Sequence, residues 1–336
     1  LLDWGPELLI DDGSHLIRLA HTERPGAFAR LRGAAEETTS GVRPLVELAA
    51  DGGLRVPVIG VNNARTKTLF DNLVGTGQSC VLAIADLLDP EGERPRATPV
   101  PAAGVAGQRW LVIGYGPVGA GTARHARALG ARVTVHDTDP VRALSAQHDG
   151  FPSTALLPGI AGSDVVVSAT GVWHTVGLDA LAAARPGTVF AVAGGIDDEL
   201  ALDDAARAAW ISDRVRPGVR RWRAPGEAAD VLVLADGGGV NYTAGEGNPV
   251  EIMDLSFGTQ LAALRQLVDT APEPGLVPLR AEAEAEVARI ALRGSPGEPP
   301  ASPERPDTAP AVRPGGAAQH WSVHRYRSTA AENLEE

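Results

Sequence analysis

The sequence predicts an α/β protein whose main element is a Rossmann-type doubly wound parallel sheet. Between Arg109 and about Ala244, short runs rich in Val and Ile alternate with Ala-rich segments, at the lengths of strands and helices. Strands that alternate with helices build parallel sheets. A glycine-rich stretch, 114-GYGPVG-119, follows the first apolar run and precedes the first Ala-rich segment. With 44% hydrophobic residues among 336, the chain has enough material for two packed domains.

The individual elements follow from local patterns. Residues 76–88 carry apolar side chains at the spacing of one helix face, and a proline-rich stretch over 89–104 ends this first region. Apolar strands are then expected over 110–114, 131–137, 163–171 and 188–194. Residues 279–293 return to helical spacing. Seven prolines between 294 and 316 oppose regular structure, so we expect 294–336 to form a disordered tail.

The glycine loop has the context of a dinucleotide-binding fingerprint. Gly114 permits the tight turn after the strand, Gly116 lets the backbone approach a pyrophosphate, and Gly119 lets the helix pack closely on the sheet. Asp137 follows 23 residues after Gly114, at the end of the next strand. An acid at this position accepts hydrogen bonds from both ribose hydroxyls and repels a 2′-phosphate. The sequence therefore predicts an NAD site and disfavours NADP.

Composition excludes several classes of partner. A net charge of −12 opposes binding to nucleic acid or to an anionic membrane surface, because both need clustered cations. Cys80 is the only cysteine, which excludes an internal disulfide and leaves a thiolate-rich zinc site without ligands, so we predict no metal site. No run approaches the roughly 18 apolar residues of a membrane span. We expect a soluble protein of the reducing cytoplasm.

Lys67, in 62-NNARTKTLFDN-72, is the only lysine in a chain with 30 strong bases. Arginine cannot lose its proton in a protein, whereas a partly buried lysine can take and return one. Asp71 lies four residues further on, which places the two side chains on one face of a helix. The pair is compatible with acid–base chemistry at an active site and also with an ordinary surface ion pair.

A series of stretches, in the same order, resembles the S-adenosylhomocysteine hydrolase family from about Pro6 to Arg293. The matching stretches are LLIDDGSHL (8–16), RGAAEETTSGV (32–42), NNARTKTLFDNLVG (62–75), VIGYGPVGAG (112–121), ARVTVHDTDPVRAL (131–144), SATG (168–171) and GGGVNYTAGEGNP (237–249). The resemblance implies a firmly bound NAD that serves to oxidise the ribose 3′-hydroxyl of an adenosine-type nucleoside or thionucleoside. It further implies loss of the C5′ thiol, addition of water and reduction of the 3′-ketone.

The resemblance also assigns roles to residues. Lys67 falls on the family lysine beside the 3′-hydroxyl, Asp71 on the acid that holds this lysine, and Asp12 and Glu37 on two further acids of the ribose site. Other positions match the family's contacts to the cofactor. These cofactor-binding residues are Thr38, Thr39, Ser40, Asn72, Gly114, Gly116, Pro117, Val118, Gly119, Asp137, Thr170, Gly171 and Asn241.

The resemblance divides the chain into segments and implies a homo-oligomer. The expected segments are part of an α/β substrate domain over 1–88, a Pro-rich linker over 89–104, an inserted NAD-binding Rossmann domain over 105–247, a return to the substrate domain over 248–293 and the tail over 294–336. The family's N-terminal region has no counterpart in these residues, so we expect the substrate domain to be partial in this chain.

Three positions depart from the family pattern. Gly195 and Asn248 stand where the family has histidines, and Thr76 stands where it has a cysteine. Proton transfer at C5′ is therefore open. The sequence is compatible with full thioether hydrolysis, with a redox-only nucleoside oxidoreductase or epimerase, and with a non-catalytic NAD-binding regulatory relative.

Overall fold

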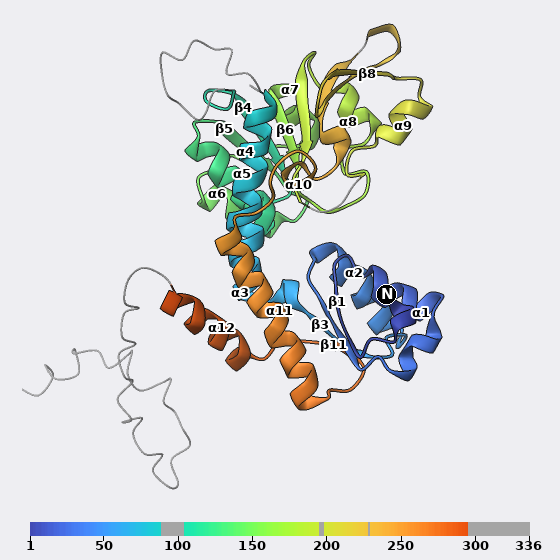
Figure 1. The fold of residues 1–336 in the computed structure, drawn as a ribbon. Helices are drawn as coiled ribbons and strands as arrows, with labels where there is room; N and C mark the ends of the chain where they lie inside the picture. Colours follow the sequence, from blue (N-terminus) through green and yellow to red (C-terminus); the bar gives the residue numbers. More distant parts are fainter. Residues whose placement is uncertain (89–103, 195–197, 228, 295–336) are drawn as a thin grey trace, which may run out of the picture. The chain divides into compact units, whose positions relative to one another are not determined.

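The computed structural model describes residues 1–88, 104–194, 198–227 and 229–294 (Figure 1). The chain divides into two compact units, Leu1–Ala291 and Leu292–Glu336, and every strand described below belongs to the first unit. The predicted linker before Gly104, and the predicted tail after Gly294, lie outside the described residues. Among the described helices, none combines the length and the apolar character that a membrane crossing requires.

The first sheet has four parallel strands in the order β1-β2-β3-β11. These strands are β1 (Leu8–Asp11), β2 (Gly33–Glu36), β3 (Pro57–Gly60) and β11 (Gly275–Val277). The helices that follow β1 and β2 are α1 (His15–Thr22) and α2 (Thr39–Ala50). Ile17 and Leu45 on these helices and Val58 on β3 are fully buried in one core. Burial of these apolar side chains holds the helices against the sheet.

The second sheet has seven strands in the order β5-β4-β6-β7-β10-β9-β8. The five strands from β5 to β10 are parallel and fit the doubly wound pattern; β5, β4, β6 and β7 are the four predicted strands, and β10 was not predicted. The strands are β4 (Arg109–Ile113), β5 (Arg132–His136), β6 (Val165–Ser168), β7 (Thr188–Val192), β8 (Ile211–Arg216), β9 (Val219–Arg223) and β10 (Asp230–Leu234). The fold class, α/β with parallel sheets, is confirmed.

The antiparallel pairs at the β8 edge were not part of the sequence prediction. β8 pairs antiparallel with β9, and β9 pairs antiparallel with β10. The β8 sequence ISDRVR is almost entirely exposed, so it lacks the alternation of buried and exposed positions that identifies a strand. Charged side chains on an edge strand also discourage pairing with another chain.

A continuous helical segment, formed by α3 (Arg65–Lys67), the π-helical stretch Thr68–Thr76 and α4 (Gly77–Leu88), connects the two sheets along the chain. Further helices complete the fold. These are α5 (Pro117–Ala128), α6 (Pro140–His148), α7 (Leu156–Gly162), α8 (Leu178–Ala182), α9 (Leu202–Arg207), α10 (Val240–Thr243), α11 (Val250–Thr270) and α12 (Ala281–Gly294). The predicted helix over 279–293 is thus α12, which begins two residues later than the sequence suggested.

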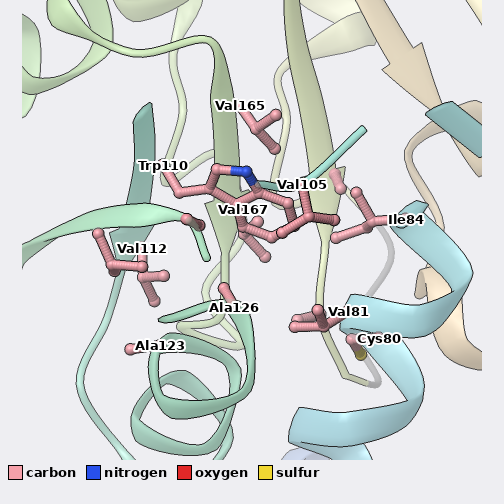
Figure 2. Packing of buried hydrophobic residues seen from close by; sticks show 14 of the residues in the cluster. Cys80, Val81, Ile84, Val105, Trp110, Val112, Ala123, Ala126, Val165 and Val167 are labelled. Carbon is pink, nitrogen blue, oxygen red and sulfur yellow. The ribbon is translucent and has the colours of Figure 1, made fainter. Parts of the chain in front are cut away.

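The largest core lies between the second sheet and helices α4 and α5. Figure 2 shows Trp110 of β4 at its centre, with Val167 of β6, Ile84 of α4 and Ala126 of α5 around it. All four are fully buried. The Trp110 indole donates to the side chain of Gln108, so the one polar atom of this ring is satisfied.

The α4–α5 crossing depends on two glycines in direct backbone contact. A Cβ atom added to Gly121 of α5 would lie 1.8 Å from the Leu73 carbonyl oxygen, and one added to Gly77 would lie 2.5 Å from the Gly121 carbonyl carbon. Because real Cβ atoms do not approach backbone so closely, these positions accept only glycine without a shift of the helices.

We predict that Gly121→Ala lowers the free energy of unfolding by about 1–3 kcal/mol. The helix preference of alanine, about 1 kcal/mol, acts in the opposite direction but does not relieve the backbone contact. Gly162→Ala is the matched control, because a Cβ at this helical glycine has no neighbour within 4 Å. Urea unfolding of both variants measures the difference. Equal stabilities would contradict the close-packed crossing.

Candidate active site

A cavity of about 450 Å³ lies where parallel strands of both sheets end. Its walls include Asp12 after β1, Glu37 after β2, Gly116 after β4, Ala169 after β6 and Ala193 after β7. Crevices beyond the carboxyl ends of parallel strands are where α/β proteins bind ligands. The topology therefore brings together polar residues that lie far apart in the sequence.

All but three of the predicted site residues line this cavity. The residues that do so are Asp12, Glu37, Thr38, Thr39, Ser40, Lys67, Asp71, Asn72, Gly116, Pro117, Val118, Thr170, Gly171 and Asn241. The exceptions are Gly114, Gly119 and Asp137. Of the three departures from the family pattern, Asn248 and Thr76 also line the cavity, whereas Gly195 lies outside the described residues.

Lys67 is buried at the centre of a group that we call the amine cluster: Lys67, Glu37, Asp71 and Asn72. The Lys67 Nζ donates to Asn72 Oδ1 at 2.5 Å, and it lies 3.3 Å from Asp71 Oδ2 and 3.7 Å from Glu37 Oε1. Only 5% of Lys67 is exposed. The surface ion pair that the sequence left open is therefore wrong for this residue. A buried ammonium needs such partners, because the loss of hydration is otherwise uncompensated.

The π-helical stretch explains why Lys67 reaches Asn72. Lys67 directly precedes this stretch and lies five residues before Asn72, the separation at which a π-helix brings residues next to each other along its axis. Asn72 also donates to Asn62 Oδ1 at 2.9 Å, which fixes the amide with its oxygen toward the ammonium. π-Helical turns often occur at functional sites.

The two acids of the amine cluster have different surroundings. Asp71 accepts from the Asn248 amide at 2.6 Å on Oδ1 and from the Ser256 hydroxyl at 2.7 Å on Oδ2. Glu37 accepts from the Gln260 amide on Oε2, while its buried Oε1 has no hydrogen-bond partner. Burial raises the pKa of Glu37, although the charge of Lys67 opposes this shift. A ligand hydroxyl can therefore donate a hydrogen bond to Glu37 Oε1.

Two buried glutamates that the sequence analysis missed hold the loops of the site. Glu36 accepts from the backbone N–H of Gly13, Ser14 and Thr38 and from the Thr38 hydroxyl, and so fixes the loop that carries Asp12. A Cβ on Gly41 would lie 2.1 Å from Glu36 Oε1, so a glycine there leaves room for this carboxylate. The pair of glutamates in 36-EETTS-40 was the available signal.

Glu199 does the same for the loop after β6. Its carboxylate accepts from the Ser168 hydroxyl at 2.5 Å, from both the backbone N–H and the hydroxyl of Thr170, and from the Gly171 N–H at 2.9 Å. Arg43 donates to the carbonyl oxygens of Thr170 and Gly171 from α2. No motif singled out Glu199, because its partners lie about 30 residues earlier in the chain.

The loop after β4 has the geometry that a pyrophosphate requires. Gly114 has φ +90°, and a Cβ on Gly119 would lie 1.8 Å from the Gly114 carbonyl oxygen, so both positions favour glycine. Asp137 accepts from the N–H of Tyr115 at 2.6 Å and of Asp139 at 2.8 Å, which fixes both carboxylate oxygens beside the loop. Asn241 adds a buried Oδ1 without a partner in the cavity wall. The glycine loop fits the pyrophosphate of a dinucleotide, and the unpartnered Oδ1 of Asn241 fits an amide group of the same ligand.

The described residues contain one group with metal-ligating atoms close together, His174, Asp203 and Asp204, within 4.8 Å of one another. Arg207 contacts the carboxylates of both Asp203 and Asp204, so a guanidinium already offsets part of their negative charge. None of these residues lines the cavity. The cluster reads as an ion-pair network at the start of α9.

Replacing Asp137 with Ala is predicted to weaken NAD binding by about 1–3 kcal/mol, through loss of charge-assisted hydrogen bonds to the ribose. NADP should lose less, because the repulsion of its 2′-phosphate disappears. Asp139→Ala is the control: Asp139 accepts from Val141 N–H as the cap of α6, so its loss affects stability but not the NAD to NADP ratio. Calorimetry with both cofactors gives the result, and equal affinities in the unmodified protein would refute the assignment.

Comparison with known proteins agrees with these features. Residues 95–247 match the family model of the S-adenosyl-L-homocysteine hydrolase NAD binding domain. S-inosyl-L-homocysteine hydrolase from Methanothermobacter thermautotrophicus is 36% identical over 300 residues, which cover 87% of this chain and 67% of that protein. Adenosylhomocysteinase from Thermotoga maritima is 37% identical over 297 residues, covering 87% and 69%. Adenosylhomocysteinase from Thermoplasma acidophilum is 36% identical over 300 residues, covering 88% and 70%.

The resemblance inferred from the sequence is thereby confirmed, as is the expectation of an NAD-binding domain. The chain belongs to the adenosylhomocysteinase and S-inosyl-L-homocysteine hydrolase family of NAD-binding enzymes.

Proposed function

We propose that this enzyme uses bound NAD to oxidise and re-reduce the ribose 3′-hydroxyl of an adenosine-type nucleoside or thionucleoside. The observation that carries the proposal is the burial of the only lysine of the chain among carboxylates, in the wall of the cavity that the glycine loop also lines. A buried amine with acid partners is suited to proton transfer.

Each polar residue near the ribose has its own role in this proposal. Lys67 acts from its neutral form: its amine takes the proton of the 3′-hydroxyl and returns it on reduction, and Asp71 holds Lys67 in place from 3.3 Å. The free Oε1 of Glu37 accepts a ribose hydroxyl. Asp12, which lines the cavity, serves proton transfer at C4′. The chemistry that bound NAD supplies is acceptance of the hydride from C3′ and its return.

The cofactor is held by two sets of residues in this proposal. The loop after β4 takes the pyrophosphate, with Asp137 on the adenosine ribose, and Asn241 offers its free Oδ1 to the carboxamide N–H. The remaining cofactor residues are Thr38, Thr39, Ser40, Asn72, Thr170 and Gly171, all in the cavity wall. We assign 1–88 and 248–293 to the substrate domain and 105–247 to the NAD-binding domain. A homo-oligomer and a cytoplasmic location stay predictions.

We further propose that thiol release at C5′ is slow or absent, and that the redox half of the reaction dominates. Asn248 donates to Asp71 and Thr76 and accepts from the Ser79 hydroxyl at 2.8 Å. An amide held in this way neither gains nor loses a proton, so it cannot replace an imidazole in acid–base catalysis. The specific alternative that this observation favours is a redox-only nucleoside oxidoreductase or epimerase.

Changing Lys67 to Arg is predicted to lower nucleoside oxidation by a factor on the order of 10² or more, because the positive charge stays but the transferable proton is lost. NAD binding should change little. The assay follows the near-ultraviolet absorbance of reduced nicotinamide in a single turnover, with adenosine and its thioethers as substrates. Arg65→Lys is the control, because Arg65 lies two residues away with 77% of its side chain exposed. Unchanged oxidation by the Lys67 variant would exclude the proton-carrying role.

The same reactions also show whether the thiol is released from C5′. We expect little free thiol when S-adenosylhomocysteine is supplied, even where reduced nicotinamide forms. Rapid release of homocysteine from S-adenosylhomocysteine would contradict this part of the proposal and would indicate full hydrolysis. Absence of reduced nicotinamide with every nucleoside would contradict the redox function itself.

A further inference from the structure

We propose that Gln260 of α11 is a positioning residue for the ribose reaction: it binds one carboxylate oxygen of Glu37 and thereby leaves the other as the acceptor for substrate. This inference rests on the proposed function. It concerns a residue that neither the glycine loop nor any other sequence motif singled out.

The face that α11 buries is polar over its first half, whereas Ala263 and Leu267 further along the helix belong to an apolar core. Ser256 donates to Asp71 Oδ2, and Gln260, one turn later, donates to Glu37 Oε2 at 2.5 Å. Ser256 is fully buried and Gln260 is 8% exposed, whereas Phe257 and Leu261 on the same helix are more than half exposed. A helix that packs only for stability buries its apolar face instead. The polar face of α11 therefore serves the two acids of the amine cluster.

The contact with Gln260 decides which Glu37 oxygen is free. With Oε2 bound to the amide, Oε1 is the oxygen that lies 3.7 Å from Lys67 Nζ and has no hydrogen-bond partner. An ionised carboxylate accepts only, so a ribose hydroxyl can donate to this oxygen. A protonated Glu37 would present a hydroxyl there and lose this capacity.

The charges around Glu37 give the direction of the pH effect. Burial raises the pKa of Glu37, Lys67 lowers it, the Gln260 amide lowers it, and the carboxylates of Asp71 and Asp12 raise it. Removing the amide therefore raises the pKa further and favours the protonated, inactive form. The acid limb of the activity profile, where activity rises with pH, should move to higher pH.

The test compares Gln260→Met with Gln266→Met. Methionine keeps the length of the side chain and removes the amide. Gln266 is the matched control, because it is a buried glutamine on the same helix whose amide bonds only backbone groups, the Pro278 carbonyl and the Arg280 N–H. The expected result is a shift of the acid limb and at least a severalfold lower rate of nucleoside oxidation in the first variant. Gln266→Met should lower the stability of the protein without shifting the acid limb of the pH–activity profile. Gln260→Asn, whose shorter amide does not reach Glu37, replaces the first variant if that fails to fold.

Infrared spectroscopy measures the same contact without turnover. The carboxyl stretching band that disappears in Glu37→Gln belongs to protonated Glu37, and it should persist to higher pH in Gln260→Met than in the unmodified protein. An unmoved band would overturn the inference. A moved band in an enzyme that oxidises no nucleoside would show that Gln260 controls the protonation of Glu37, but it would overturn the proposed function and with it the role of Gln260 in the ribose reaction.

Discussion

The burial of a single ammonium group, that of Lys67, requires most of the polar contacts in this site. Lys67 is removed from water, and a charge in the interior is tolerated only when carboxylates and dipoles replace its hydration. Glu37, Asp71 and the Asn72 amide supply these from two separate parts of the chain. Each of these partners must in turn be held. The hydrogen bonds that reach outward to Asn62, Asn248 and the polar face of α11 are the consequence of burying one charge.

The loops at the strand ends obey a related constraint. Tight loops expose backbone N–H groups that need acceptors once they are buried. Glu36 accepts four hydrogen bonds from the loops after β1 and β2, and Glu199 accepts four from the end of β6 and the loop after it. Carboxylates that bind no ligand in the proposed mechanism thus fix the positions of those that do. The loops at the rim of the cavity are thus hydrogen-bonded to buried carboxyl groups rather than to solvent.

The sequence predicted those site residues that belong to short local motifs. The GYGPVG turn, its acid at Asp137 and the interval between Lys67 and Asp71 are short patterns with direct physical meaning, and the family motifs extended them to the cavity wall. Gln260 and Glu199 could not be found in this way. Gln260 meets Glu37 across 223 residues, and only the folded chain brings them together. The polar strand β8 was missed because an exposed edge leaves no hydrophobic pattern.

The unbroken helical segment from Arg65 to Leu88 restricts insertions and deletions within these residues. Its first half carries the amine, and its second half is locked to α5 by the contact between Gly77 and Gly121. One residue inserted between these halves would rotate Lys67 about the helix axis relative to the locked end, because each residue of a helix turns the chain by a fixed angle. Surface loops of this protein can gain or lose residues during divergence. This helical segment can exchange side chains but cannot change its length.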